Sequence, residues 1–107
     1  MTHYKVRYTQ SSENDLDGIF RYIARVLCEP AIAANLLDEI DREIGKLETM
    51  PERYPLIGVP ELRDSGYRKM LLHKDYLVIY TIDETEHIVY IERVISARRD
   101  WVRLLLV

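Results

Sequence analysis

The sequence predicts a single small α+β domain with the order β-α-α-β-β-β, in which a helical hairpin packs on a mostly antiparallel sheet. Two patterns carry this prediction. Apolar residues recur at helical spacing between residues 11 and 48, and three short runs rich in tyrosine, valine and isoleucine follow between residues 67 and 96. Length agrees, because 107 residues suit one domain and the apolar share of 48% is ample for a core.

The first half of the chain predicts a strand followed by two helices. Residues 1–8 are assigned to a strand, because apolar and charged side chains alternate over residues 4–8. Residues 11–48 are assigned to the helical hairpin, with Ser11 or Ser12 as the N-cap and Pro30 in the first turn of the second helix. Two apolar stripes are expected to face the sheet: Leu16, Ile19, Phe20, Ile23 and Leu27, then Ile32, Ala33, Leu36, Leu37, Ile40, Ile44 and Leu47. Asp17 and Arg21 are spaced for an ion pair across one helical turn.

The second half predicts a three-stranded meander over residues 67–96, with strands at 67–72, 76–82 and 87–96. Residues 76–80 are apolar without interruption, so this strand is expected to be central and covered on both faces. Residues 97–107 form a C-terminal segment, which is predicted to be a short helix or an extended tail. Two-layer packing of the hairpin on the sheet follows from these elements.

Composition excludes several classes of protein. The net charge of −3 does not suggest a generic nucleic-acid binder, although residues 61–107 are neutral overall and keep clusters of basic side chains. The longest apolar run is five residues, against the roughly 20 that cross a bilayer, and no signal-peptide core is present. One cysteine, Cys28, cannot form an internal disulfide; it is expected to pack at a helix end, in a cytoplasmic protein.

No motif predicts a cofactor or a metal. The four glycines are scattered, and His3, His73 and His87 lie far apart in the sequence, without the spacing of metal ligands. The candidate chemistry lies instead in the basic residues of the second half, which are Arg63, Arg68, Lys69, Lys74, Arg93, Arg98, Arg99 and Arg103. Several arginines on one sheet face could hold an RNA backbone. The alternative is that they pair with acids nearby, such as Glu92 and Asp100, or keep the sheet in solution.

The order of elements and five short strings resemble the RelE/ParE superfamily of bacterial toxins from type II toxin–antitoxin modules. The strings are YKVRY at residues 4–8, DLDGI at 15–19 with YI at 22–23, GYRK at 66–69, YLVIY at 76–80, and RV at 93–94 followed by RRD at 98–100. The likeness covers nearly the whole chain. It implies the RelE/ParE-like fold, growth inhibition, a role of the plasmid-stabilization kind, and no metal or organic cofactor.

The resemblance implies one of two mechanisms, because the superfamily holds both on one fold. RelE-like members are mRNA interferases that cut mRNA in the ribosome, whereas ParE-like members inhibit DNA gyrase and cut nothing. Matched to the RelE-like pattern, Arg68, Lys69 and Arg99 would hold the scissile phosphate. Other expected polar positions fall on apolar residues, namely Met70, Leu77 and the neighbourhood of Leu105. The sequence therefore favours the ParE-like mechanism, with RelE-like cleavage as the alternative and a degenerate toxin acting only as a co-repressor partner as a third reading.

The expected partners follow from the same resemblance: a cognate antitoxin, gyrase or the ribosome as target, and operator DNA only through the antitoxin. Arg98, Trp101, Leu104 and Leu105 are the predicted antitoxin or target contacts, because residues 104–107 are unusually apolar for a chain end. Docking of this tail onto the protein's own helices is the alternative. If gyrase is the target, the helical hairpin and the C-terminal segment are the expected contact surfaces.

Overall fold

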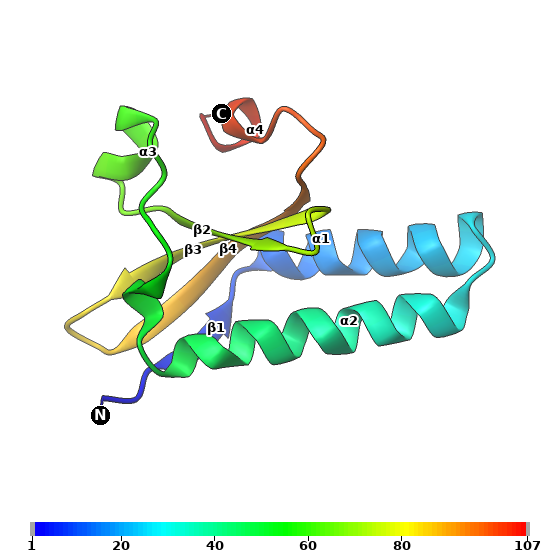
Figure 1. Ribbon diagram of the computed structural model, residues 1–107, viewed down its shortest axis with the longest axis horizontal. Helices are drawn as coiled ribbons and strands as arrows, with labels where there is room; N and C mark the ends of the chain where they lie inside the picture. Colours follow the sequence, from blue (N-terminus) through cyan, green and yellow to red (C-terminus); the bar gives the residue numbers. More distant parts are fainter. Residues whose placement is uncertain (1, 107) are drawn as a thin grey trace.

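The computed structural model describes residues 2–106 and is built around a four-stranded sheet. The strands are β1 (Lys5–Tyr8), β2 (Arg68–Leu72), β3 (Tyr76–Asp83) and β4 (Ile88–Ser96), in the spatial order β1-β4-β3-β2. β1 runs parallel to β4, and the other two pairings are antiparallel, so the predicted sheet is confirmed (Figure 1). Met1 and Val107, which belong to the predicted first strand and apolar tail, lie outside the described residues.

The predicted helical hairpin is confirmed, but its N-cap is not the predicted residue. It consists of α1 (Gln10–Arg21), which continues as the π-helix η1 (Tyr22–Val26), and α2 (Pro30–Gly45), which ends in the 3-10 turn η2 (Lys46–Glu48). The N-cap is Thr9, whose Oγ1 accepts the backbone N–H of Ser12 at 3.1 Å. Ser12 Oγ donates back to the Thr9 carbonyl at 2.9 Å, so the serine completes the cap from inside the helix.

One face of the sheet packs against the hairpin, and this hairpin-side core is the larger of two clusters. Its buried members are Ile40, Ile44, Leu47, Met70, Leu72, Val78, Tyr80, Val89, Ile91 and Val94. The far end of the hairpin projects past the sheet (Figure 1). For this reason Leu27 and Ile32 are 51% and 55% exposed and Phe20 is 37% exposed, although the helical stripes predict them to be covered. Cys28, predicted to pack at a helix end, is exposed for the same reason.

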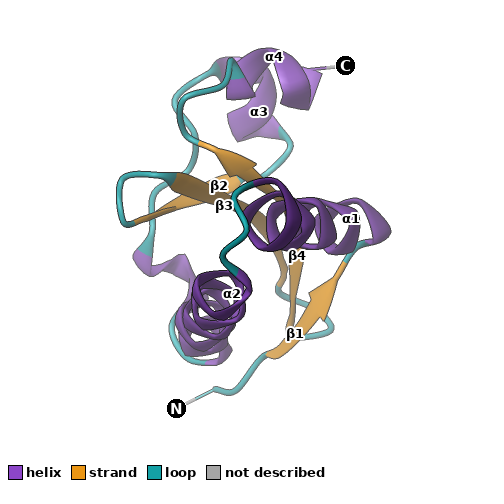
Figure 2. Ribbon diagram, turned by 90° about the vertical axis from the view of Figure 1, so that its right-hand side faces the viewer, coloured by secondary structure: helices purple, strands orange, loops and turns teal. Residues whose placement is uncertain are grey.

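The opposite face of the sheet is also covered, which the two-layer expectation did not include. Two short helices, α3 (Pro60–Asp64) and α4 (Trp101–Leu106), lie on the side away from the hairpin (Figure 2). The C-terminal segment is therefore a short helix, docked on the protein's own sheet rather than on the hairpin helices. The uninterrupted apolar run in β3 follows from this arrangement, because residues 77–80 are buried from both sides.

Tight turns without glycine connect the three strands of the meander. His73 and Lys74 join β2 to β3 with φ of 52° and 65°, a left-handed conformation that these residue types adopt infrequently. His73 Nε2 lies 2.7 Å from Oε1 of Glu39 on α2, so this contact links the turn to the hairpin.

Candidate functional site

The alternation of β2 and β3 separates the basic residues that the sequence groups together. Leu71 pairs with Leu77 and Lys69 pairs with Ile79 across the two strands. Because alternate residues of a strand point to opposite faces, these four side chains share the face away from the hairpin. Arg68 has the other parity and belongs to the hairpin side. Only Lys69 of the predicted β2 pair therefore lies on the same face as Leu77.

The face that carries Leu77 is occupied by an apolar cluster, here called the α4 cluster. Its buried members are Ile57, Leu62, Leu77, Ile79 and Ile95, and the half-buried residues around them are Val59, Tyr67, Ala97, Trp101, Val102, Leu104 and Leu105. Three of the four predicted partner contacts thus pack on the protein's own sheet. Burial of this kind excludes water and phosphate from the middle of the face.

Lys69 contacts this cluster rather than standing free. Its Nζ lies 4.8 Å from the centroid of the Trp101 ring, which is a cation–π distance. The contact joins β2 to α4, which are about thirty residues apart in sequence. Lys69 therefore has a structural partner in this conformation.

Arg68 holds the loop that leads from the hairpin to the sheet. Its Nη1 donates to the carbonyl of Tyr54 at 2.6 Å and to that of Glu52 at 3.3 Å. The same loop accepts a hydrogen bond from Tyr80, whose hydroxyl donates to the Pro51 carbonyl at 2.5 Å. Burial raises the pKa of Tyr80 to about 12, against the opposing effect of the Arg68 charge.

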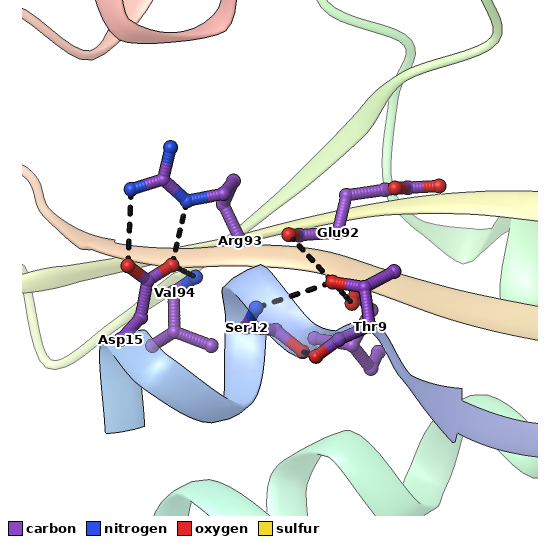
Figure 3. Close-up of polar contacts among 7 residues, drawn as sticks. Thr9, Ser12, Asp15, Glu92, Arg93 and Val94 are labelled. Carbon is purple, nitrogen blue, oxygen red and sulfur yellow. Dashed lines mark hydrogen bonds and ion pairs between the residues drawn. The ribbon is translucent and has the colours of Figure 1, made fainter. Parts of the chain in front are cut away.

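Arg93 forms the best-defined ion pair of the molecule, with Asp15 on α1 (Figure 3). Nε and Nη2 of the guanidinium lie 2.7 and 3.0 Å from the two carboxylate oxygens, and the Val94 N–H donates to the same carboxylate at 2.9 Å. The hydrogen bond with Asp15 raises the pKa of Arg93. The sequence offers Glu92 as a nearby acidic partner for Arg93, but the observed partner is Asp15.

The Asp15 contact follows from where β1 ends. β1 pairs with β4 only as far as Tyr8 and Ile91, so the edge of β4 is open beyond that point. Thr9 Oγ1 reaches the carbonyls of Ile91 and Glu92, both at 3.0 Å, and Asp15 accepts the next free N–H. The first turns of α1 thereby take the place of strand partners that β1 is too short to supply.

The last two arginines of the candidate set lie in different surroundings. Arg98 is 86% exposed and lies 3.6 Å from Asp75 in a surface ion pair of little energetic weight. Arg99 lines a cavity beside α1, together with Asn14 and Tyr76. The structure thus gives Arg68, Lys69 and Arg99 three separate environments and does not assemble them around a common point.

The described residues contain no group of three or more side chains that could hold a metal ion. No helix between residues 2 and 106 is both long and apolar enough to span a membrane. Two of the three histidines have local side-chain partners: His73 contacts Glu39, and His87 packs edge-on against Tyr4 with ring centroids 5.2 Å apart.

A groove on the outer side of the hairpin was not foreseen from sequence. It has a volume of about 540 Å³ and combines apolar Leu16, Phe20 and Leu37 with the acidic Glu13 and Asp17. A smaller cavity of about 210 Å³ shares Leu16 and Leu37 and adds residues at the β1 end of the hairpin. Phe20 and Leu37 lie at the edges of the two apolar helical stripes. This position at the edge is the sequence feature that indicates a place on the surface groove.

The end of the hairpin carries an exposed apolar patch, here called the hairpin tip. Tyr22, Val26, Leu27 and Ile32 are each more than half exposed. The first two belong to the π-helix η1, an element that is frequent at functional sites. An apolar surface of this kind on a small domain is typical of a contact with another protein.

The fold is that of toxins from toxin–antitoxin complexes. The chain superposes with a TM-score of 0.74 on a chain of the chromosomal ParDE system from P. aeruginosa, at 18% identity, covering 90% of this chain and 98% of that one. It superposes with a TM-score of 0.61 on a chain of the RelBE2 toxin–antitoxin complex from Mycobacterium tuberculosis, at 28% identity, covering 90% and 93%. No curated protein sequence matches the chain.

Sequence comparison identifies the family. Residues 6–101 match the family described as ParE toxin of the type II toxin–antitoxin system parDE. That span is nearly the whole chain, so the protein belongs to this family of toxins, as the resemblance implied.

Proposed function

We propose that the protein is a growth-inhibitory toxin that acts as ParE-like members do, by binding DNA gyrase without cutting RNA or DNA. A cognate antitoxin, the partner that its relatives have in their complexes, neutralises it. Its place of action is the cytoplasm, where gyrase and the antitoxin are found.

The observation that carries this proposal is the covered sheet face. A ribonuclease that cuts through the 2′-hydroxyl needs cations, an acid and a base around one phosphate. Here Leu77 and Ile79 lie under α3 and α4, and Lys69 contacts Trp101. Arg68 donates to loop carbonyls, and Arg99 lines the cavity beside α1.

The hairpin tip is the surface that we assign to the target. It is apolar, exposed, and carried at the far end of two long helices, where it can enter a contact without disturbing either core. The covered α4 cluster is less suited to this role, because Trp101, Leu104 and Leu105 already pack on the sheet.

The test is a supercoiling assay with purified gyrase and the toxin freed from its antitoxin. The wild-type protein is expected to inhibit supercoiling, and primer extension on mRNA from a translating extract is expected to show no codon-phased cuts. Leu27→Asp at the hairpin tip should weaken inhibition about tenfold or more, because a charge would enter an apolar contact. Leu71→Asp is the matched control, since Leu71 on β2 is 55% exposed and Leu27 is 51% exposed.

Two results would overturn the proposal. Codon-phased cuts without gyrase inhibition would assign the protein to the mRNA-cutting class. A folded toxin that shows neither activity would be a degenerate member that serves only as the antitoxin's partner. Equal loss of inhibition in both leucine variants would remove the hairpin tip from the argument while leaving gyrase as the target.

A further inference from the structure

A second large cavity lies between α1 and the ends of β3 and β4, and it shares Asn14 with the hairpin groove and Ile95 with the α4 cluster. Its volume is about 520 Å³, within the roughly 300–1,000 Å³ range of small-molecule sites. The residues that give it chemical character are Asn14, Gly18, Tyr22, Tyr76, Ser96 and Arg99. The proposed gyrase contact uses none of them except Tyr22, at its margin.

The charged groups of this cavity are one arginine, Arg99, and one carboxylate, Asp15. The one carboxylate in its wall, Asp15, is already neutralised by Arg93 and bound by the Val94 N–H. The guanidinium of Arg99 has no ion-pair partner among residues 2–106. A cavity with a free cation and a satisfied carboxylate favours an anionic ligand.

Two further polar groups of the cavity wall each accept one hydrogen bond from the protein and keep a donor of their own. The Asn14 carbonyl oxygen accepts from the Gln10 side chain at 3.0 Å, which leaves the Asn14 amide protons available. Ser96 Oγ accepts the Arg98 N–H at 3.3 Å, so its own hydroxyl proton is available. Both groups therefore add hydrogen-bond donors to the wall that also carries Arg99.

The remaining wall is aromatic and apolar. Tyr22 and Tyr76 contribute two rings, and burial raises the pKa of Tyr76, with Asp75 and Tyr22 acting in the same direction, so this hydroxyl stays protonated. Tyrosine rings bind flat, conjugated groups by stacking. The cavity thus combines a surface for a planar ring with donors for an anion.

Gly18 keeps the cavity open. It lies inside α1, where glycine is less stable than alanine by about 0.5–1 kcal/mol, and a Cβ added there would meet no atom within 4 Å. A larger side chain at this position would therefore extend into the cavity without displacing backbone.

We propose that this cavity binds a free nucleoside monophosphate, with the base against the two tyrosines and the phosphate toward Arg99. The ligand is a single nucleotide rather than a strand, because Glu13 lies next to the cavity residue Asn14 on α1 and the whole chain carries −3. Both would repel the further phosphates of a polynucleotide.

The test is an NMR titration of the full-length, isotope-labelled protein with AMP, adenosine, inorganic phosphate and a single-stranded tetranucleotide as separate probes. AMP is expected to shift the amide signals of Gly18, Tyr22, Tyr76 and Arg99. Adenosine and phosphate alone should each bind about tenfold more weakly, because each supplies only half of the recognised chemistry. The tetranucleotide should bind no more tightly than AMP.

Gly18→Leu should weaken AMP binding about tenfold or more by filling the cavity, whereas Gly45→Leu should leave it unchanged. Gly45 is the matched control, because it is also a helical glycine with open space around it but does not line the cavity. Arg99→Gln, an exposed position that does not threaten folding, should weaken AMP binding and leave adenosine binding unchanged.

AMP shifts that persist in Gly18→Leu and Arg99→Gln would overturn the assignment, as would the absence of any AMP shift in the wild-type protein. A tetranucleotide that binds about tenfold more tightly than AMP would overturn the choice of a single nucleotide. If Gly18→Leu does not fold, judged by its own spectrum, Arg99→Gln alone decides. All of these readouts are independent of gyrase.

Discussion

Asp15 is the residue on which the junction between α1 and β4 depends. Its carboxylate accepts two hydrogen bonds from Arg93 and one from the Val94 backbone, and the two side chains are only 14% and 27% exposed. Removing one partner of such a pair leaves a poorly solvated charge and an unpaired N–H, which costs more than the pair contributes.

Asp15→Asn is expected to lower the free energy of unfolding by about 2–3 kcal/mol, measured by urea denaturation. Asp17→Asn is the matched control on the same helix. Asp17 pairs with Arg21 at 3.2 Å, as its spacing predicted, but both side chains are more than half exposed, so the cost should stay below about 1 kcal/mol. Equal costs for the two variants would contradict the assigned role of Asp15.

Tyr80 is expected to make the free energy of unfolding fall at alkaline pH. It is fully buried, its hydroxyl donates to the Pro51 carbonyl, and its pKa is raised from 10.0 to about 12. Between these values the folded protein keeps the proton while the unfolded chain loses it. Linkage then requires stability to be present below about pH 10 and to fall as the pH rises toward 12.

The expected measurement is the urea midpoint at pH 9, 10, 11 and 12 for the wild-type protein and for Tyr80→Phe. The variant should lose about 1–2 kcal/mol at pH 9, because the Pro51 carbonyl is left unpaired, and should show a shallower decline above pH 10. Tyr4, whose pKa is also raised to about 12 by its bond to Glu84, contributes part of the remaining slope. An unchanged slope in the variant would exclude Tyr80 as a source.

At the scale of elements, α4 is a cover for the sheet rather than a free tail. Its Trp101 and Leu105 pack against the buried α4 cluster, whereas Leu106 is 52% exposed. The apolar chain end therefore has a contact within the molecule, and its contact with the antitoxin stays a prediction. An antitoxin that binds this face has to displace α4 or bind over it.

Leu105→Ala is expected to cost about 2 kcal/mol, the lower end for a leucine that packs in a core, because its side chain is only half-buried. Leu106→Ala, next to it on the helix, should cost less than about 0.5 kcal/mol. Thermal unfolding followed by circular dichroism measures both. A larger effect at Leu106 would show that α4 docks through another face in solution.

At the scale of the whole molecule, β3 joins the two clusters. Val78 and Tyr80 belong to the hairpin-side core, and Leu77 and Ile79 belong to the α4 cluster. Because adjacent residues of one strand serve the two clusters, neither cluster can lose its part of β3 without disturbing the other.

The molecule is therefore expected to unfold in one cooperative step. Trp101, the single tryptophan, reports on the α4 side by fluorescence, and far-ultraviolet circular dichroism reports mainly on the hairpin. The two urea transitions should coincide. A fluorescence transition at a lower urea concentration than the circular dichroism transition would mean that α4 and its cluster unfold on their own.

Local pattern was enough to predict most of the fold. Helical periodicity, proline at the start of α2 and the uninterrupted apolar run in β3 are properties of neighbouring residues, so the order of elements and the central place of β3 could be read without a structure. The N-cap of α1, Thr9, lies two or three residues before the predicted Ser11 or Ser12, because all three side chains are chemically able to cap a helix.

The candidate site could not be predicted in the same way. The sheet face on which a basic residue lies depends on strand register. In this register Lys69 contacts Trp101 on one face, whereas Arg68 donates to loop carbonyls on the other. The Arg93–Asp15 pair joins residues 78 positions apart, and nothing in either neighbourhood indicates it.

By itself the sequence determined the family, the order of elements and the apolar positions where RelE-like chemistry would need charge, because these depend on residue type and spacing along the chain. Only the tertiary structure decided that α4 covers the sheet face, that the hairpin tip is exposed, and that a donor-rich cavity opens beside Gly18. The physical reason is that burial and charge pairing are set by contacts between distant segments, which come together only when the chain folds.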